Sequence, residues 1–249
     1  MLCGGLIVTP ECKICEDRGI IFDGKEAKPC DCVRERNLRR RVEKANLPPR
    51  LRGHTFDRFS LRYYSKIIRD DRGRSAFDHA ADAVRHAKEF VEAYLVGESR
   101  EGLMFCGDVG AGKTFLASCI ANAVLERGGE VLFLVVPDFL DQIRATYDGR
   151  DEVTERDLIE CAKNVPLLIL DDLGAHMYTE WARQKIYSLL NHRLNYELPV
   201  IVTTNLDLEG FAQHLGWRTA SRLFEMCRIY RLMREMDIRI RKKRDALGD

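Results

Sequence analysis

The residues Gly102-Leu-Met-Phe-Cys-Gly107-Asp108-Val109-Gly110-Ala111-Gly112-Lys113-Thr114-Phe115 decide the fold of this chain. They read as a short apolar strand, a glycine-rich turn and the start of a helix that continues to Leu125. From Gly107 to Thr114 the stretch fits G-x-x-x-x-G-K-[ST] at every fixed position. The alternative is a glycine turn that matches by accident, but it leaves the apolar strand before the turn and the apolar helix after it unexplained.

The spacing of these residues has a mechanical reason. Glycines let the backbone curl so that successive N–H groups point at a phosphate, and the helix that begins near Lys113 adds the positive end of its dipole. Lys113 then reaches the β- and γ-phosphates, and the Thr114 hydroxyl is the expected magnesium ligand. We therefore predict that residues 107–115 bind a nucleoside triphosphate.

Length and composition are those of a soluble globular protein. The 249 residues suffice for one α/β domain with a small appendage. No apolar run is long enough to span a bilayer, and the N-terminus lacks the basic stretch of a signal peptide, so we expect a cytoplasmic protein. Residues 218–244 carry ten Lys and Arg against three Asp and Glu. Such a basic end suggests an anionic partner, although solvated surface charge explains it equally well.

Four cysteines near the N-terminus form two close pairs, Cys12-Lys-Ile-Cys15 and Cys30-Asp-Cys32. In a cytosolic protein, clustered cysteines more often hold a metal than form disulfides. We predict a tetrahedral zinc site with all four thiolates as ligands. The segment between the pairs is too short and polar to bury a core, so the metal would supply much of its folding energy. Free thiols or a redox pair are the alternative.

A basic connector with a helical sequence pattern, residues 31–45, follows the cysteines. The prolines at 48 and 49 end it, since proline stops a helix. We expect a cysteine-cluster module at 1–48 and the main domain at 49–249.

The main domain alternates helical and strand patterns. Continuous apolar strands separated by helices indicate a parallel sheet that is covered on both faces. Amphipathic spacing predicts a first helix over 76–95. The expected strands are 103–106, 131–136, 167–170, 200–203 and the weaker 228–232, and the expected helices between them are 113–127, 138–147, 155–163 and 180–195.

Polar residues follow two of these strands. Asp171 and Asp172 end the strand at 167–170, and Asn205 follows the strand at 200–203. Downstream of a phosphate loop, Asp171 is the expected magnesium ligand, and Asp172 is suited to polarise an attacking water. Asn205 suits a hydrogen bond to the γ-phosphate or to that water; alternatively it only begins a turn.

This order of motifs, with Ser221-Arg222-Leu223 in a helix further on, resembles the AAA+ ATPases. The more specific similarity is to the bacterial replicative helicase loaders of the DnaC/DnaI type. It covers roughly residues 10–240 and is supported by the cysteine cluster and by local sequences at 47–50, 55–59, 136–140 and 221–225. The resemblance implies a five-stranded AAA+ sheet with a minimal lid, because only 27 residues follow Arg222.

The resemblance also implies roles for single residues. Lys113 and Thr114 take the phosphate-loop roles, and Asp171 is the magnesium ligand. Asp172 stands where many AAA+ proteins carry the catalytic glutamate, so a slow ATPase is expected. Asn205 resembles the first sensor, and Arg222 an arginine finger that acts on ATP bound by a neighbouring subunit. Such a finger is worth about 10³–10⁵ in rate in related enzymes.

Further roles follow from the family for the C-terminal segment and for DNA. Arg239, after Asp237, is a candidate second sensor. In the family, single-stranded DNA lies along the helix pair between the second and third strands, which here maps onto Phe139, Arg144 and Tyr147. A core position for Phe139 and a surface position for Arg144 are the alternative.

Three functions compete on this basis. The first is an ATP-dependent loader of the DnaB-type replicative helicase that acts on single-stranded DNA with ATP, Mg²⁺ and Zn²⁺ and assembles through a shared ATP site. The second is an IstB-like transposition helper ATPase, a group that typically begins with a helical domain instead of a cysteine cluster. The third is a nucleotide-binding adaptor with negligible hydrolysis.

Overall fold

The structure is a computed structural model, and it describes residues 12–22, 26–30, 32–33, 43–148, 154–234 and 236–247. The chain divides into two compact units, Met1–Lys44 and Ala45–Asp249. In the first unit, β1 (Ile20–Phe22) and β2 (Ala27–Pro29) form an antiparallel pair. Most of the predicted basic connector at 31–45 lies outside the described residues.

The second unit is built on a five-stranded sheet in which all neighbouring strands are parallel. The strand order is β4-β5-β6-β3-β7. This confirms the predicted parallel α/β sheet, and the observed strand ends differ from the predicted ones by a residue or less. The strands are β3 (Gly102–Gly107), β4 (Val131–Val135), β5 (Leu167–Asp171), β6 (Val200–Thr203) and β7 (Cys227–Leu232).

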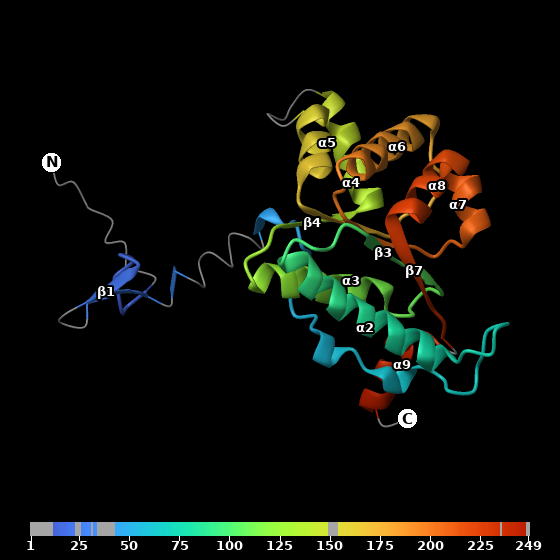
Figure 1. Cartoon of the computed structure of the whole chain (residues 1–249), viewed down its shortest axis with the longest axis horizontal. Helices are drawn as coiled ribbons and strands as arrows, with labels where there is room; N and C mark the ends of the chain where they lie inside the picture. Colours follow the sequence, from blue (N-terminus) through green and yellow to red (C-terminus); the bar gives the residue numbers. More distant parts are fainter. Residues whose placement is uncertain are drawn as a thin grey trace. The chain divides into compact units, whose positions relative to one another are not determined.

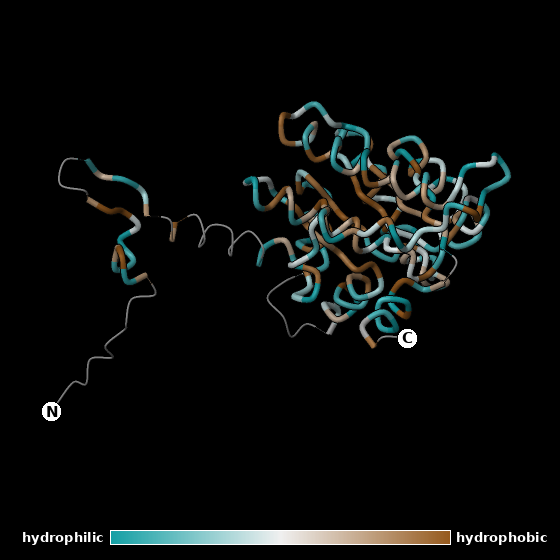
Figure 2. The backbone as a smooth tube through the Cα atoms, turned by 90° about the horizontal axis from the view of Figure 1, so that it is seen from below, coloured by the Kyte–Doolittle hydropathy of each residue, from teal (hydrophilic) through white to brown (hydrophobic). Residues whose placement is uncertain are grey.

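Helices cover both faces of this sheet (Figure 1). The helices α2 (Ala76–Leu95) and α3 (Lys113–Glu126) lie on one face. The other face carries α4 (Val136–Ala145), α5 (Glu155–Asn164), α6 (Glu180–Asn195), α7 (Leu208–Leu215) and α8 (Trp217–Met226). A last helix, α9 (Ile238–Leu247), follows β7. Figure 2 shows hydrophobic backbone segments gathered in the interior of this unit, where the apolar strands lie.

The helices of the structure differ from the predicted ones by more than one residue at three places, α4, α7 and α9. The helix expected at 138–147 begins two residues earlier, at Val136, because Pro137 fits the first turn of a helix, where no intrahelical N–H bond is required. The helices α7 and α9 were not predicted as such. The first has only eight residues, too few to establish a helical period, and the second is a basic run in which polar residues dominate.

The division between the two units falls at Lys44 and Ala45, four residues before the boundary expected from the prolines. Ala45 and Leu47 are both buried, and the Ala45 carbonyl accepts a hydrogen bond of 2.8 Å from the Phe133 N–H of β4. The segment before the prolines is therefore part of the larger unit. Pro49 begins a short 3₁₀ turn, Pro49–Leu51, inside that unit.

The strand order points to a place at the carboxyl ends of the strands that suits a ligand. The chain leaves β3 through α3 toward β4 at one side of the sheet, whereas after β6 it crosses to β7 at the other side. In open parallel sheets, ligands bind at the carboxyl ends of the strands near such a reversal. The loop at 107–112 lies there, next to the ends of β5 and β6.

Candidate functional site

The phosphate loop joins β3 directly to α3. Gly107, Gly110 and Gly112 all have positive φ, and Gly112 is the residue that precedes the first turn of α3. At φ 77° for Gly110, a side chain is strained and would also collide with the Asp237 carboxyl group. The first amide groups of a helix have no partner within it. This backbone therefore offers an array of N–H groups for an anion.

Hydrogen bonds to its backbone carbonyl oxygens hold the phosphate loop in place. The Lys113 ammonium donates to the Gly107 and Asp108 carbonyls at 2.8 and 2.7 Å. Three further carbonyls accept from outside the loop: Val109 from the Arg234 guanidinium, Gly110 from the Ile238 N–H and Ala111 from the Tyr64 hydroxyl. The Gly112 carbonyl accepts from the Leu116 N–H of α3. These bonds fix the loop. The Asp108 and Ala111 N–H groups donate to the Leu232 and Asp108 carbonyls, so the other amide groups of the loop are the ones that suit a phosphate.

Lys113 links the loop to the end of β6. Its ammonium donates to Asn205 Oδ1 at 2.7 Å, and the side chain is buried. Burial lowers the pKa of Lys113 to about 8, against the opposing effect of the Asp172 and Asp108 carboxylates. A buried cation that contacts only neutral oxygens suits the charge of a phosphate.

Asp171 at the end of β5 meets two hydroxyl groups. Thr114 Oγ1 donates to Asp171 Oδ1 at 2.8 Å, and Thr203 Oγ1 of β6 donates to the same oxygen at 2.6 Å. Burial raises the pKa of the Asp171 carboxyl group, while these two hydrogen bonds act to lower it. A carboxylate beside a threonine hydroxyl, where the phosphate loop joins α3, is an oxygen donor set that fits Mg²⁺.

Asp172 occupies a strained turn directly after β5. Its φ of 59° lies in the left-handed region, which is uncommon for residues other than glycine. The Asp172 N–H donates to Thr203 Oγ1 at 2.9 Å, and its Oδ1 accepts from Asn205 Nδ2 at 3.3 Å. The structure thus brings together Lys113, Thr114, Asp171, Asp172 and Asn205, five of the residues that the sequence singled out.

Aromatic residues from the segment before α2 pack against the start of α3. Phe59 lies against Gly112 and its ring is 5.6 Å from that of Tyr64. His54 stacks on Phe115 with ring centroids 4.0 Å apart, and Lys242 of α9 lies over the same Phe115 ring. His54, Tyr64 and Lys242 had no spacing signal, because they lie far from the loop along the chain.

Two arginines that the sequence singled out, Arg222 and Arg239, pair with acidic residues outside the cluster around Lys113 and Asp171. Arg222 on α8 is partly exposed and pairs with Glu225 on its own helix at 3.1 Å. Arg239 on α9 pairs with Asp237 at 3.0 Å. The Asp237 carboxyl group touches Gly110, so Arg239 is near the phosphate loop.

The structure corrects one of the predicted DNA contacts. Phe139 is buried in the core between α4 and the sheet, so its ring has no face for a nucleotide base. It lies on the same face of α4 as the buried Val136, Leu140 and Ile143, at helical spacing. Tyr147 is 60% exposed and Arg144 is also exposed. Both meet Trp181, which the sequence did not indicate: its Nε1 donates to the Tyr147 hydroxyl at 3.0 Å, and the Arg144 guanidinium lies 5.6 Å from its ring.

The four N-terminal cysteines come together in the first unit. Their sulfur atoms all lie within 4.8 Å of one another. Burial opposes ionisation of Cys15, but hydrogen bonds from the Gly19 N–H and from the neighbouring thiols outweigh it and lower the pKa of Cys15 to about 7. Since thiolates are the metal ligands, four sulfurs at this spacing fit a tetrahedral zinc ion.

None of the helices in the described ranges has both the length and the hydropathy of a membrane span. The glycine loop, the lysine, the hydroxyl group and the strand-end carboxylates instead define a P-loop protein that binds a nucleoside triphosphate at the carboxyl edge of a parallel sheet.

Comparison with known families agrees with this class. Residues 75–245 match the family described as IstB-like ATP binding protein, and the chain belongs to that family. It is 30% identical over 134 residues to the replicative helicase loader DnaI of Bacillus subtilis (strain 168), which covers 53% of this chain and 42% of that protein. It is 26% identical over 169 residues to the replicative helicase loader DnaC of Escherichia coli (strain K12), 68% of either chain.

Solved structures extend the similarity to the fold. A crystal structure of DnaI is 26% identical, with a TM-score of 0.59 over 75% of this chain and 94% of that one. A crystal structure of the DnaC helicase loader is 23% identical with a TM-score of 0.59. The predicted similarity to AAA+ ATPases of the DnaC/DnaI type is confirmed. The chain spans about half the length of the first curated relatives it matches.

Proposed function

We propose that this protein binds and slowly hydrolyses ATP and, in doing so, loads the replicative hexameric helicase onto single-stranded DNA. One observation carries the ATPase part. Groups from the ends of three adjacent strands, β3, β5 and β6, converge through Lys113–Asn205 and Thr114–Asp171 hydrogen bonds. The loading part is supported by relatives that are named replicative helicase loaders.

Each residue of the cluster has a role in this proposal. The amide groups of 107–115 and the Lys113 ammonium hold the phosphates. Thr114 and Asp171 hold Mg²⁺, which neutralises charge on the β- and γ-phosphates when bound. Asp172 orients and polarises the attacking water, and Asn205, which already contacts both Lys113 and Asp172, reports whether the γ-phosphate is present.

The site is completed by a second subunit in this proposal. Arg222 projects from α8 and pairs only with Glu225 among the described residues, so it is free to reach ATP bound by a neighbour. Hydrolysis then requires assembly, and a monomer is nearly inactive. The exposed Arg144 and Tyr147 contact single-stranded DNA through phosphate and base, with Trp181 beside them.

The cysteine cluster is proposed as a zinc site that shapes the module at 1–48, which docks on the helicase. Metal analysis of the purified protein is expected to find about one zinc per chain. Cys30→Ser is expected to lose it, whereas Cys161→Ser, a cysteine exposed on α5, keeps it. A folded wild-type protein without metal would refute the site.

The partner is tested by a pull-down of the host's purified replicative helicase with the full chain in the presence of ATP or ADP. The proposal expects binding that depends on the nucleotide and that Lys113→Ala loses. The transposition helper, which the family description keeps in view, predicts no helicase binding and capture of a transposase instead. Binding that ignores the nucleotide points to a passive adaptor. The proposed partners, DNA and helicase, imply a cytoplasmic location.

A further inference from the structure

We propose that Thr203 is a positioning residue for magnesium: its hydroxyl group orients Asp171 as a metal ligand and holds Asp172 in its turn. The proposal rests on the proposed function, since it concerns the Mg²⁺ of the ATP site. Thr203 is the last residue of β6 and lies outside the phosphate loop and the strand-end carboxylate pair. It touches neither nucleotide nor metal in this role, and it acts through its two neighbours.

The hydroxyl group of Thr203 is both a hydrogen-bond donor and a hydrogen-bond acceptor. It donates to Asp171 Oδ1 at 2.6 Å and accepts from the Asp172 N–H at 2.9 Å. The side chain is 1% exposed, so water cannot replace either bond without entering the core. Because a hydroxyl group has one proton, the bond to Asp171 commits that proton and fixes the direction in which the oxygen accepts from Asp172.

These bonds follow from the parallel pairing of β5 and β6. Leu170 lies opposite Val202 in the sheet, which brings the next residues, Asp171 and Thr203, side by side at the strand ends. The Thr203 carbonyl also accepts from the Leu173 N–H at 2.9 Å. Thr203 therefore accepts hydrogen bonds from two consecutive N–H groups, those of Asp172 and Leu173. These bonds support the positive φ of Asp172.

The consequence for the metal lies in which oxygen of Asp171 is engaged. Both hydrogen bonds, from Thr203 and from Thr114, end on Oδ1, and Oδ2 has no donor among the described residues. The hydroxyl of Thr203 thus fixes the rotation of the carboxylate and leaves its second oxygen for a cation. Partners that hydrogen-bond a metal ligand commonly contribute 10–100-fold to metal affinity.

The neighbouring Thr204 provides a matched control. It is equally buried, and its hydroxyl group accepts from the Leu206 N–H at 3.0 Å without touching either carboxylate. Replacing Thr204 by valine removes a buried hydroxyl group from the same segment. An effect that comes only from a weakened fold appears in both valine variants, and an effect on metal positioning appears only at position 203.

The test measures the affinity of the full chain for the fluorescent analogue mant-ATP, first in EDTA and then over a Mg²⁺ titration. Thr203→Val is expected to keep its affinity in EDTA within about twofold and to need roughly tenfold more Mg²⁺ for the half-maximal effect. Thr203→Ser, which keeps the hydroxyl group, and Thr204→Val are both expected to titrate like the wild type.

Two results overturn the proposal. If Thr203→Val titrates with Mg²⁺ like the wild type, Thr203 does not position the metal ligand, although the ATP site itself stands. If Thr204→Val shifts the Mg²⁺ titration as far as Thr203→Val does, the effect is structural. A wild-type protein that binds mant-ATP without any Mg²⁺ dependence, or fails to bind it, contradicts the proposed function instead.

Discussion

The two strands β5 and β6 carry buried charge at both of their ends, and the two ends use it differently. Before the strands begin, Arg193 of α6 is fully buried among backbone carbonyl groups. Where the strands finish, Asp171 is buried among hydroxyl groups and lies near Lys113. The same sheet thus holds a buried cation at the amino ends of these strands and a mixed polar cluster at their carboxyl ends.

Arg193 is occupied by fixed partners. Its guanidinium donates to five carbonyl oxygens, those of Ala162, Lys163, Val165, Pro166 and Pro199. The first two belong to the last turn of α5, where a cation is favourable, and the last two directly precede β5 and β6. Burial lowers the pKa of Arg193 to about 10, so it remains charged at neutral pH. This cation fixes the amino ends of two strands.

The carboxyl ends are not closed in this way. Lys113 contacts only neutral oxygens, and Asp171 accepts hydrogen bonds on only one of its two oxygens among the described residues. Both cations are held by oxygens of the fold, but only the carboxyl ends of the strands also hold a buried carboxylate, Asp171, with one oxygen that accepts no hydrogen bond among the described residues. The comparison separates a structural charge from a functional one on the same pair of strands.

The largest expected effect tests whether the carboxyl edge is completed by another subunit. Arg222→Ala is expected to lower ATP hydrolysis by about 10³-fold or more, since an arginine finger contributes that much in related enzymes. Mixing Arg222→Ala with Lys113→Ala subunits should restore part of the rate, because some interfaces then combine an intact loop with an intact arginine. Phosphate release measures it. Mixtures that assemble and stay inactive would remove Arg222 from this role.

The second prediction concerns Arg193, at the amino ends of β5 and β6. Arg193→Leu should lower the free energy of unfolding by about 3–5 kcal/mol, since it leaves buried carbonyl groups unpaired. Denaturant unfolding measures this, and Arg193→Lys should lose less, because it keeps the charge but not the planar fork. At temperatures where they are folded, both variants should bind mant-ATP like the wild type. An Arg193→Leu variant as stable as the wild type would falsify the structural role.

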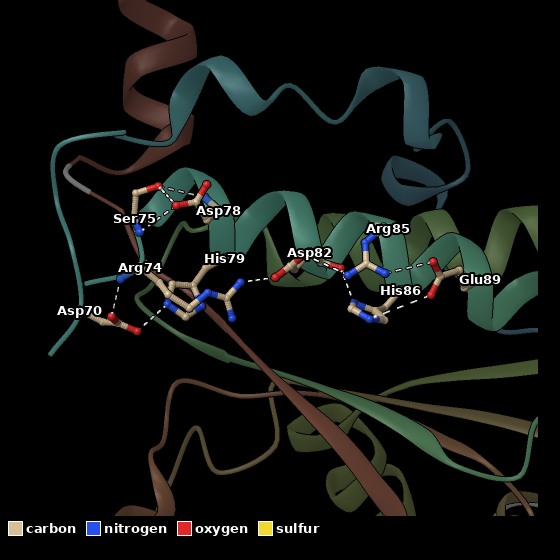
Figure 3. A network of polar contacts seen from close by, with 9 residues as sticks. All are labelled: Asp70, Arg74, Ser75, Asp78, His79, Asp82, Arg85, His86 and Glu89. Carbon is tan, nitrogen blue, oxygen red and sulfur yellow. Dashed lines mark hydrogen bonds and ion pairs between the residues drawn. The ribbon is translucent and has the colours of Figure 1, made fainter. Parts of the chain in front are cut away.

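A third polar cluster, in the segment before α2 and along that helix, is a partly exposed network (Figure 3). Asp70 accepts from the Arg74 N–H and contacts the His79 ring at 2.7 Å. These bonds lower the pKa of the Asp70 carboxyl group below its ordinary value, the Arg74 N–H first. The carboxylate therefore adds stability above its unfolded-state pKa, and this stability is lost as the pH falls through the folded-state pKa.

Asp70→Asn should consequently lower the Tm at pH 7 by about 2–4 °C, because it removes the charge of a pair that is only partly exposed. The difference from the wild type should shrink as the pH is lowered past about 4. Thermal unfolding followed by circular dichroism at several pH values measures both. A difference that stays constant down to pH 3 would show that the carboxylate charge is not what stabilises the loop.

Periodicity and motif spacing were sufficient for the sheet and for the residues at its carboxyl edge. Strand ends at Asp171 and Thr203 are visible in the sequence because apolar runs stop there, and parallel strands bring such ends together. The pairing of Lys113 with Asn205 follows from the same rule. Local patterns therefore predict a site whose members all stand at strand ends.

What the sequence did not reveal depends on contacts between distant segments. Arg193 reads as one charge on a helix, and only the tertiary structure shows five carbonyl groups around it. Tyr64 and Ile238 bond the phosphate loop from segments without a motif, and no periodic pattern records such contacts.

The claim that the carboxyl edge is the nucleotide site is tested most directly by mant-ATP binding to the full chain with Mg²⁺. The wild type is expected to bind saturably, and Lys113→Ala, which removes the ammonium next to Asn205, to show no saturable binding. Lys163→Ala, a lysine on α5 paired with Glu160, serves as the matched control and should bind like the wild type. Undiminished affinity in Lys113→Ala would contradict the account.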